Sequence, residues 1–187
     1  GPGGAILYLS GLTRPPGSRS RASSQGVIAM AEVFEISELV KVAIEDERSG
    51  VAFYSALAEK SAALKSTFAD LADQERHHQA RFEQMLENLG GLKTPEQYAG
   101  EYAAYIEALT TGRAFPDEAT AARMARQCAS DAEALQLAGR FERDTLILLN
   151  EMSGLLSTKH AEIIDDIASE EQAHLVTLTE AQRQLGR

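Results

Sequence analysis

Residues 68–89 carry an apolar stripe with a carboxylate and an imidazole at its centre. The apolar residues recur at steps of three and four, which places them on one face of an α-helix. Glu75 and His78 lie within this stripe, and their spacing of three residues places both side chains on that face. Because an ionised carboxylate is costly to bury alone, Glu75 requires a proton, a cationic side chain or a metal ion beside it.

Each of three further segments has an apolar stripe with a glutamate at its centre. These stripes span residues 40–58, 135–156 and 164–181. The central glutamates are, in the same order, Glu47, Glu142 and Glu171. The last stripe also repeats the Glu-x-x-His pair, because His174 follows Glu171 by three residues.

The four stripes form an internal repeat of one helical hairpin. Glu47 precedes Glu75 by 28 residues, and Glu142 precedes Glu171 by 29. Each half therefore has a lone glutamate followed by a Glu-x-x-His pair, which is the signature of a duplicated structural unit. One Glu from each of two helices and Glu-x-x-His from each of the other two is the ligand set of ferritin-like dinuclear carboxylate proteins.

The chain resembles the rubrerythrin-type members of the ferritin-like superfamily. Four short stretches carry the resemblance, one on each predicted long helix: residues 47–54, 73–78, 141–144 and 170–174. All six primary ligand positions are filled. A single Glu-x-x-His is common on helix surfaces, whereas two of them in register with two core glutamates form a specific pattern.

The resemblance implies an all-α fold, a ferritin-like antiparallel four-helix bundle with a long helical crossover between the second and third long helices. It also implies two bound iron ions (Fe2+/Fe3+), with manganese or zinc as alternative occupants of the same ligands. By position, the bridging carboxylates would be Glu75 and Glu171, the terminal ones Glu47 and Glu142, and the imidazole ligands His78 and His174.

The implied activity is that of an oxidoreductase of oxidative stress or iron metabolism, which reduces hydrogen peroxide or dioxygen at the iron pair. Rubrerythrins proper hold one further iron on two Cys-x-x-Cys pairs, but this chain has only Cys128. We therefore expect an external electron donor such as a rubredoxin-type protein. Two alternatives remain open: a ferroxidase that oxidises Fe(II) as its substrate, and a non-catalytic metal-binding bundle. The resemblance also suggests a homodimer.

Tyr54 is the candidate catalytic residue, because it lies on the same helix face as Glu47. Its hydroxyl would hydrogen-bond a ligand or act near bound oxygen species, and the alternative is a tyrosine of the core. The matching place in the second half is Leu149. Some rubrerythrins have a further glutamate one turn after the third-helix ligand, and this chain has Thr145 there.

Composition narrows the classes of function. A net charge of −10 argues against nucleic-acid binding. No apolar run approaches the roughly 20 residues of a membrane-spanning helix, so we expect a protein that is not in the membrane. A single cysteine cannot form an internal disulfide, which is compatible with a reducing cytoplasm, the location that we expect.

The segment boundaries follow from glycine, proline and helix-capping signals. Residues 1–33 are rich in Gly, Pro, Ser and Arg and predict a flexible N-terminal segment before a ferritin-like domain at 34–187. Met30, just before the regular pattern, is a candidate natural start, with a flexible tail as the alternative. We expect the first long helix to start at Ser37 and end near Glu59.

Within the domain, a short connection near residues 60–63 leads to the second long helix, which should end at Gly90 and Gly91. Residues 92–130 form the crossover, with amphipathic segments at 96–109 and 117–127. Ser130 and Glu133 form a capping box that opens the third long helix. Ser157 or Thr158 caps the fourth.

Overall fold

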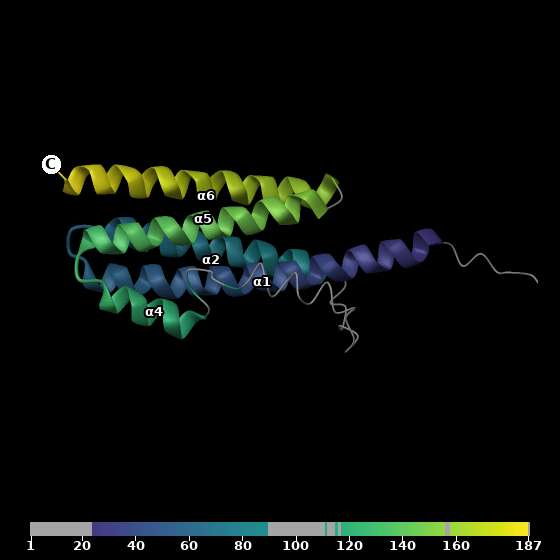
Figure 1. Cartoon of the computed structure of the whole chain (residues 1–187), viewed down its shortest axis with the longest axis horizontal. Helices are drawn as coiled ribbons and strands as arrows, with labels where there is room; N and C mark the ends of the chain where they lie inside the picture. Colours follow the sequence, from purple (N-terminus) through teal and green to yellow (C-terminus); the bar gives the residue numbers. More distant parts are fainter. Residues whose placement is uncertain (1–23, 90–110, 112–114, 116, 156–157, 187) are drawn as a thin grey trace, which may run out of the picture.

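Within the described residues, four long helices form a bundle and one shorter helix lies along its side (Figure 1). The computed structural model describes residues 24–89, 111, 115, 117–155 and 158–186. Its helices are α1 (Ser24–Lys60), α2 (Lys65–Asn88), α4 (Glu118–Gln127), α5 (Asp131–Leu155) and α6 (Thr158–Leu185). The described residues contain no strand, and no helix among them is long and apolar enough to cross a membrane.

Two helical hairpins make up the bundle, α1 with α2 and α5 with α6 (Figure 1). The hairpins meet where α1 packs against α5 and α2 packs against α6. Helix α4 precedes α5 and packs on the outside of α1. This arrangement confirms the predicted ferritin-like bundle with a helix in the crossover. The amphipathic segment predicted at 96–109 lies outside the described residues.

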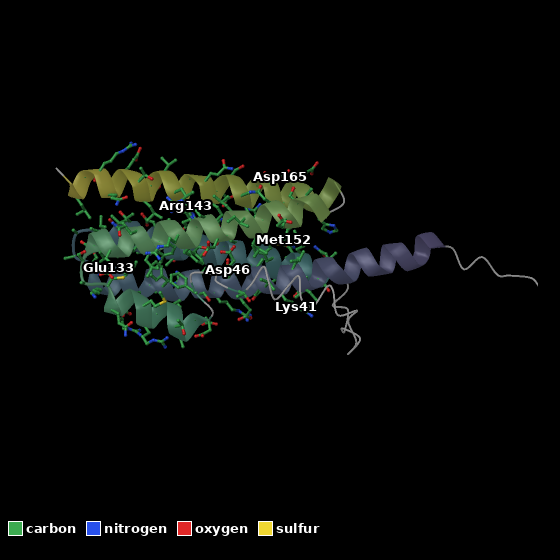
Figure 2. All side chains as sticks on the ribbon, viewed as in Figure 1. Lys41, Asp46, Glu133, Arg143, Met152 and Asp165 are labelled. Carbon is green, nitrogen blue, oxygen red and sulfur yellow. The ribbon has the colours of Figure 1, made fainter. Side chains whose placement is uncertain are left out.

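The core consists of two apolar clusters with a polar layer between them. One, the phenylalanine cluster, includes Phe53, Phe68, Phe115 and Phe141. The other, the aliphatic cluster, includes Leu39, Val40, Met152, Ile164 and Ile167. On every long helix the acidic and imidazole residues of the stripes lie between the residues of these two clusters. On α5, for example, Leu135 of the phenylalanine cluster precedes Glu142, and Met152 of the aliphatic cluster follows it. Met152 is labelled near the end of α5 in Figure 2. The clusters therefore cover the polar layer from both ends of the bundle.

The first helix begins earlier than its sequence predicts. Helix α1 starts at Ser24, and Ser37 is a fully buried residue within it. A serine acts as a cap only where the preceding chain leaves the helix. Residues 27–49 contain neither glycine nor proline, so no residue interrupts the helix before Ser37. The segment predicted to be flexible is thus helical from residue 24, and residues 1–23 lie outside the described part.

Side-chain hydrogen bonds mark several of the other helix ends, whereas the predicted stop at residues 90 and 91 and the candidate cap at residue 157 lie outside the described residues. The backbone N–H of Leu64 donates to Ser61 Oγ at 3.0 Å in the short connection between α1 and α2. Asp117 caps α4 by accepting from the Thr120 N–H at 2.7 Å, and this hydrogen bond lowers the pKa of Asp117. At the start of α5, the Glu133 N–H donates to Ser130 Oγ at 3.2 Å. The Glu133 carboxylate accepts at 2.7 Å from the N–H of Ala129, the residue before the cap, so the predicted capping box is present with this donor in place of the N–H of Ser130.

Candidate metal centre

All six residues predicted as ligands are buried in the polar layer, each with at most 1% of its surface exposed. They come from all four long helices: Glu47 from α1, Glu75 and His78 from α2, Glu142 from α5, Glu171 and His174 from α6. Their ligand atoms form two groups of four, and within each group the atoms lie within 4.8 Å of one another. Helices far apart in sequence therefore bring the predicted residues to one place.

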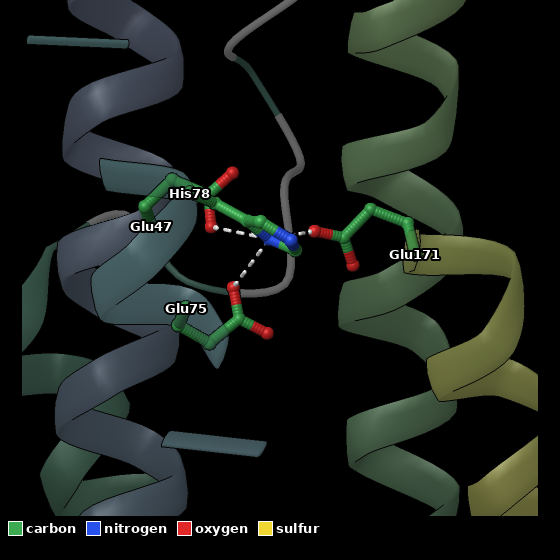
Figure 3. A group of neighbouring side chains, drawn as sticks. All are labelled: Glu47, Glu75, His78 and Glu171. Atoms are coloured by element: carbon green, nitrogen blue, oxygen red, sulfur yellow. Dashed lines mark ion pairs between the residues drawn. The ribbon is translucent and has the colours of Figure 1, made fainter. Parts of the chain in front are cut away.

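The first group contains Glu47, Glu75, His78 and Glu171 (Figure 3). The Nδ1 atom of His78 lies 2.7 Å from Glu171 Oε1. The same atom lies 3.8 Å from Glu47 Oε2 and 4.0 Å from Glu75 Oε2. Three carboxylates thus surround one imidazole nitrogen.

The second group contains Glu75, Glu142, Glu171 and His174. The Nδ1 atom of His174 lies 3.0 Å from Glu171 Oε2 and 3.4 Å from an oxygen of both Glu75 and Glu142. The two imidazole rings are stacked at 5.5 Å between centroids. Since Glu75 and Glu171 belong to both groups, each offers one oxygen to either side, as a bridging carboxylate would.

Ten buried side-chain atoms of these six residues have no hydrogen-bond partner within the described part of the chain. They include both oxygens of Glu47, Glu75 and Glu171 and the Nδ1 atom of each histidine. A buried polar atom without a partner costs about 1–3 kcal/mol, and more if it is charged. Such a concentration at one place fits a pair of cations, because metal ions would provide partners for these oxygen and nitrogen atoms. The donor set, oxygen-rich with one imidazole on each side, suits iron or manganese.

The electrostatics of the layer favour added positive charge. Burial, followed by the charge of Glu75, raises the pKa of Glu47 well above its ordinary value. Burial and the charge of Glu171 do the same to Glu142. Although burial disfavours a charged imidazole, the close carboxylates of Glu142, Glu171 and Glu75 raise the pKa of His174 to about 12. Protons therefore accumulate where the carboxylates crowd together, and a metal ion would compete with them.

Tyr54 touches the second group directly. Its hydroxyl donates a hydrogen bond to Glu142 Oε1, and its ring is fully buried beside Phe53, Phe68 and Phe141. Burial and the charge of Glu142 raise the pKa of the phenol, which keeps it protonated as a donor. The predicted hydrogen bond to a candidate ligand is thus present, and the catalytic role stays a prediction. On the other side, Leu149 is buried in the aliphatic cluster.

Two polar pairs were missed by reasoning from the sequence. Glu170 Oε2 lies 2.8 Å from His78 Nε2, and Glu170 Oε1 accepts from Arg81 Nη1 at 2.8 Å. Asp46, labelled in the middle of the bundle in Figure 2, is buried and accepts from Thr145 Oγ1 at 3.1 Å. Glu170 and Asp46 each precede a stripe glutamate by one position. Their only sequence signal is an acidic pair, which is also common on solvated helix faces.

The histidines and the cysteine outside the two groups have other surroundings. His77 is exposed, as expected for a residue one position off the stripe. His160 is half-buried near the start of α6 and belongs to neither group. Cys128 is free and buried beside α4, and burial raises the pKa of its thiol. It is therefore a packing residue, as predicted.

A family model described as rubrerythrin matches residues 38–143, more than half of the chain. The chain belongs to the rubrerythrin family. The rubrerythrin match includes four of the six predicted ligands: Glu47, Glu75, His78 and Glu142. Glu171 and His174 follow the matched range, so their assignment depends on the internal repeat and on the geometry. Neither the curated proteins nor the solved structures include a significant match.

Proposed function

We propose that this rubrerythrin-family protein binds two iron ions in its polar layer and reduces hydrogen peroxide or dioxygen there. The observation that carries the proposal is the pair of overlapping four-residue groups that share Glu75 and Glu171, with their buried atoms unpartnered in the described part of the chain. Glu47 and His78 would complete one metal position. The second would be completed by Glu142 and His174.

Charge balance supports two divalent ions. The two ligand groups together contain four carboxylates in a low-dielectric core, where unbalanced charge is strongly unfavourable. Two divalent ions would compensate four ionised glutamates. When bound, the two ferrous ions supply two electrons that, with two protons, reduce hydrogen peroxide to two molecules of water. An external donor would restore the ferrous state, and a rubredoxin-type protein is our proposal for it. We also propose a cytoplasmic homodimer.

The residues of the chain have three tasks in this function. The phenylalanine and aliphatic clusters exclude bulk water from both ends of the layer. The six ligands set the positions of the metal ions. Tyr54 holds Oε1 of Glu142, so Oε2 of that carboxylate remains for a metal ion, and the protonated phenol is a hydroxyl donor in direct contact with a proposed ligand.

The proposal is tested by anaerobic titration of the metal-free protein with Fe(II). We expect saturation at two irons per chain, followed by a rapid rise of ferric absorbance in stopped-flow mixing with hydrogen peroxide. A faster reaction with dioxygen, with release of ferric iron, would instead favour the ferroxidase. Absence of stoichiometric iron binding would refute the proposal and leave zinc or another metal to be tested.

Variants of adjacent histidines provide a matched comparison. His78→Ala and Glu75→Ala should each abolish paired iron binding, because each removes a ligand from the layer. His77→Ala should keep both irons, because His77 is exposed. Retention of two tightly held irons by both the His78 and Glu75 variants would refute the ligand assignment.

A further inference from the structure

The two imidazoles of the polar layer have different surroundings on the side away from the carboxylates. His78 Nε2 lies 2.8 Å from Glu170, whose other oxygen accepts from Arg81 at 2.8 Å. Arg81 also donates to the Ile163 carbonyl at 3.4 Å. A carboxylate on the outer nitrogen of a ligand histidine fixes the tautomer and the ring orientation, and it makes the inner nitrogen a stronger ligand. His78 is therefore oriented before any metal binds.

No described residue gives His174 this support. Its Nε2 atom is buried and has no hydrogen-bond partner in the described part of the chain. The repeat relates His78 to His174 by 96 positions, so the counterparts of Glu170 and Arg81 are Gln74 and Thr177. Both counterparts are exposed, and the Gln74 amide donates to Asp70 O of its own helix at 3.3 Å. At the corresponding positions around His174, the chain thus has neither charge of the Glu170–Arg81 pair.

The two terminal carboxylates, Glu47 and Glu142, also have different surroundings, and again the difference favours metal binding beside His78. Both oxygens of Glu47 have no hydrogen-bond partner within the described residues. In contrast, Glu142 Oε1 accepts a hydrogen bond from Tyr54. This hydrogen bond uses a lone pair that would otherwise be available to a metal ion. The counterpart of Tyr54 in the repeat is Leu149, which has no polar atom to offer Glu47. The stronger imidazole and the less occupied carboxylate therefore belong to the same half of the layer.

We propose that the two metal positions are inequivalent, with the His78 position binding its ion first and more tightly. The His78 position comprises Glu47 and His78 with the shared Glu75 and Glu171. The His174 position comprises Glu142 and His174 with the same shared residues. The inference rests on the proposed function, because it assumes that the layer binds two ions. Loss of an outer-shell partner typically lowers metal affinity 10- to 100-fold, so we expect a gap of that order.

The consequence is a stepwise centre. At limiting metal, one ion occupies the His78 position and the pair is incomplete, so two-electron chemistry begins only when the second position fills. The ion at the His174 position exchanges with solution more readily. Glu170 is a positioning residue in this scheme, since it acts on the metal through His78.

The test is titration of the metal-free full chain with Co(II), followed by visible absorption and calorimetry. We expect two binding steps whose dissociation constants differ at least 10-fold. Glu170→Gln should weaken the tight step about 10- to 100-fold and leave the weak step in place. The matched control is Asp166→Asn, which alters an exposed acid 3.7 Å from Arg81 that is not among the partners of His78. It should change neither step.

Two ligand variants establish the order of filling. His174→Ala should keep the tight step, whereas His78→Ala should lose it. The reverse result, or two ions of equal affinity in the unaltered chain, would overturn the inference and leave the proposed function intact. Failure to bind two ions at all would overturn the proposed function as well. Equal weakening of both steps by Glu170→Gln would show a general structural effect and also refute the inference.

Discussion

Replacement of Gly50 by alanine should destabilise the bundle next to the candidate metal centre. Gly50 is on α1, one turn after Glu47, where α1 approaches α5 and α2. A Cβ atom at this position would lie 2.9 Å from Phe141 Cζ and 3.1 Å from Glu75 Cδ. Phe141 is buried, and its ring packs 5.0 Å from that of Phe115, between centroids. The aromatic ring cannot retreat without disturbing the phenylalanine cluster.

The magnitude follows from two opposing contributions. Glycine to alanine within a helix gains about 1 kcal/mol of helix propensity. Overpacking a filled core costs about 1–3 kcal/mol. Gly139 on α5 is the matched control, because a Cβ there would meet only the Arg143 guanidinium, 3.5 Å away on an exposed side chain. Both variants gain the same helix propensity, so the difference between their free energies of unfolding isolates the steric cost, which we expect to be about 1–3 kcal/mol.

Urea unfolding of the two metal-free variants, followed by far-ultraviolet circular dichroism, measures this difference. In thermal unfolding, the melting temperature of Gly50→Ala should lie below that of Gly139→Ala by about 2–4 °C for each kcal/mol of difference in unfolding free energy. Because Glu75 must also shift, Gly50→Ala should bind metal more weakly, and Gly139→Ala should bind normally. Equal stability of the two variants would show that Phe141 has room to move and would refute the reasoning.

Three further predictions concern charge and hydrogen bonding in the layer. The raised pKa of His174 means that the folded, metal-free chain keeps a proton that the unfolded chain releases above its ordinary pKa of 6.5. The melting temperature in a chelator should therefore fall between pH 6.5 and 9, and a rise would contradict the assignment. Glu47→Met should raise the metal-free unfolding free energy by about 1–3 kcal/mol and impair metal binding, since it removes a buried carboxylate; calorimetry measures both effects. Thr145→Val removes a hydrogen bond to buried Asp46 and should cost about 1–3 kcal/mol in urea unfolding, whereas an unchanged midpoint would exclude that contribution.

The convergence of the six candidate ligands could be predicted from the sequence. Helical periodicity places Glu75 and His78 on the same face as the apolar residues around them, and that face must point into the core. In the second half of the repeat, the same periodicity places Glu142 on the core-facing side of α5, and Glu171 and His174 on the core-facing side of α6. What these residues bind remains a proposal, because burial and spacing do not specify the metal ion.

The start of α1 was not predictable by the same means. Ser37 has the residue type of a cap, but capping depends on the backbone before it, which continues as a helix from Ser24. Local signals mark where a helix is permitted to begin, but residues 27–36 contain no glycine or proline that would interrupt a helix before Ser37.

The sequence indicated part of the contrast between the two halves of the centre, because Leu149 takes the place of Tyr54 in the repeat, but the contacts that produce the contrast came from the tertiary structure. Helix spacing by itself determined which side chains face the core, since the period of 3.6 residues is a property of every α-helix. It could not pair Glu170 with His78 or Tyr54 with Glu142, because these partners are on different helices and meet only when the hairpins pack. The sequence thus determined the set of candidate ligands, and the packing of the four helices decided the surroundings of each one.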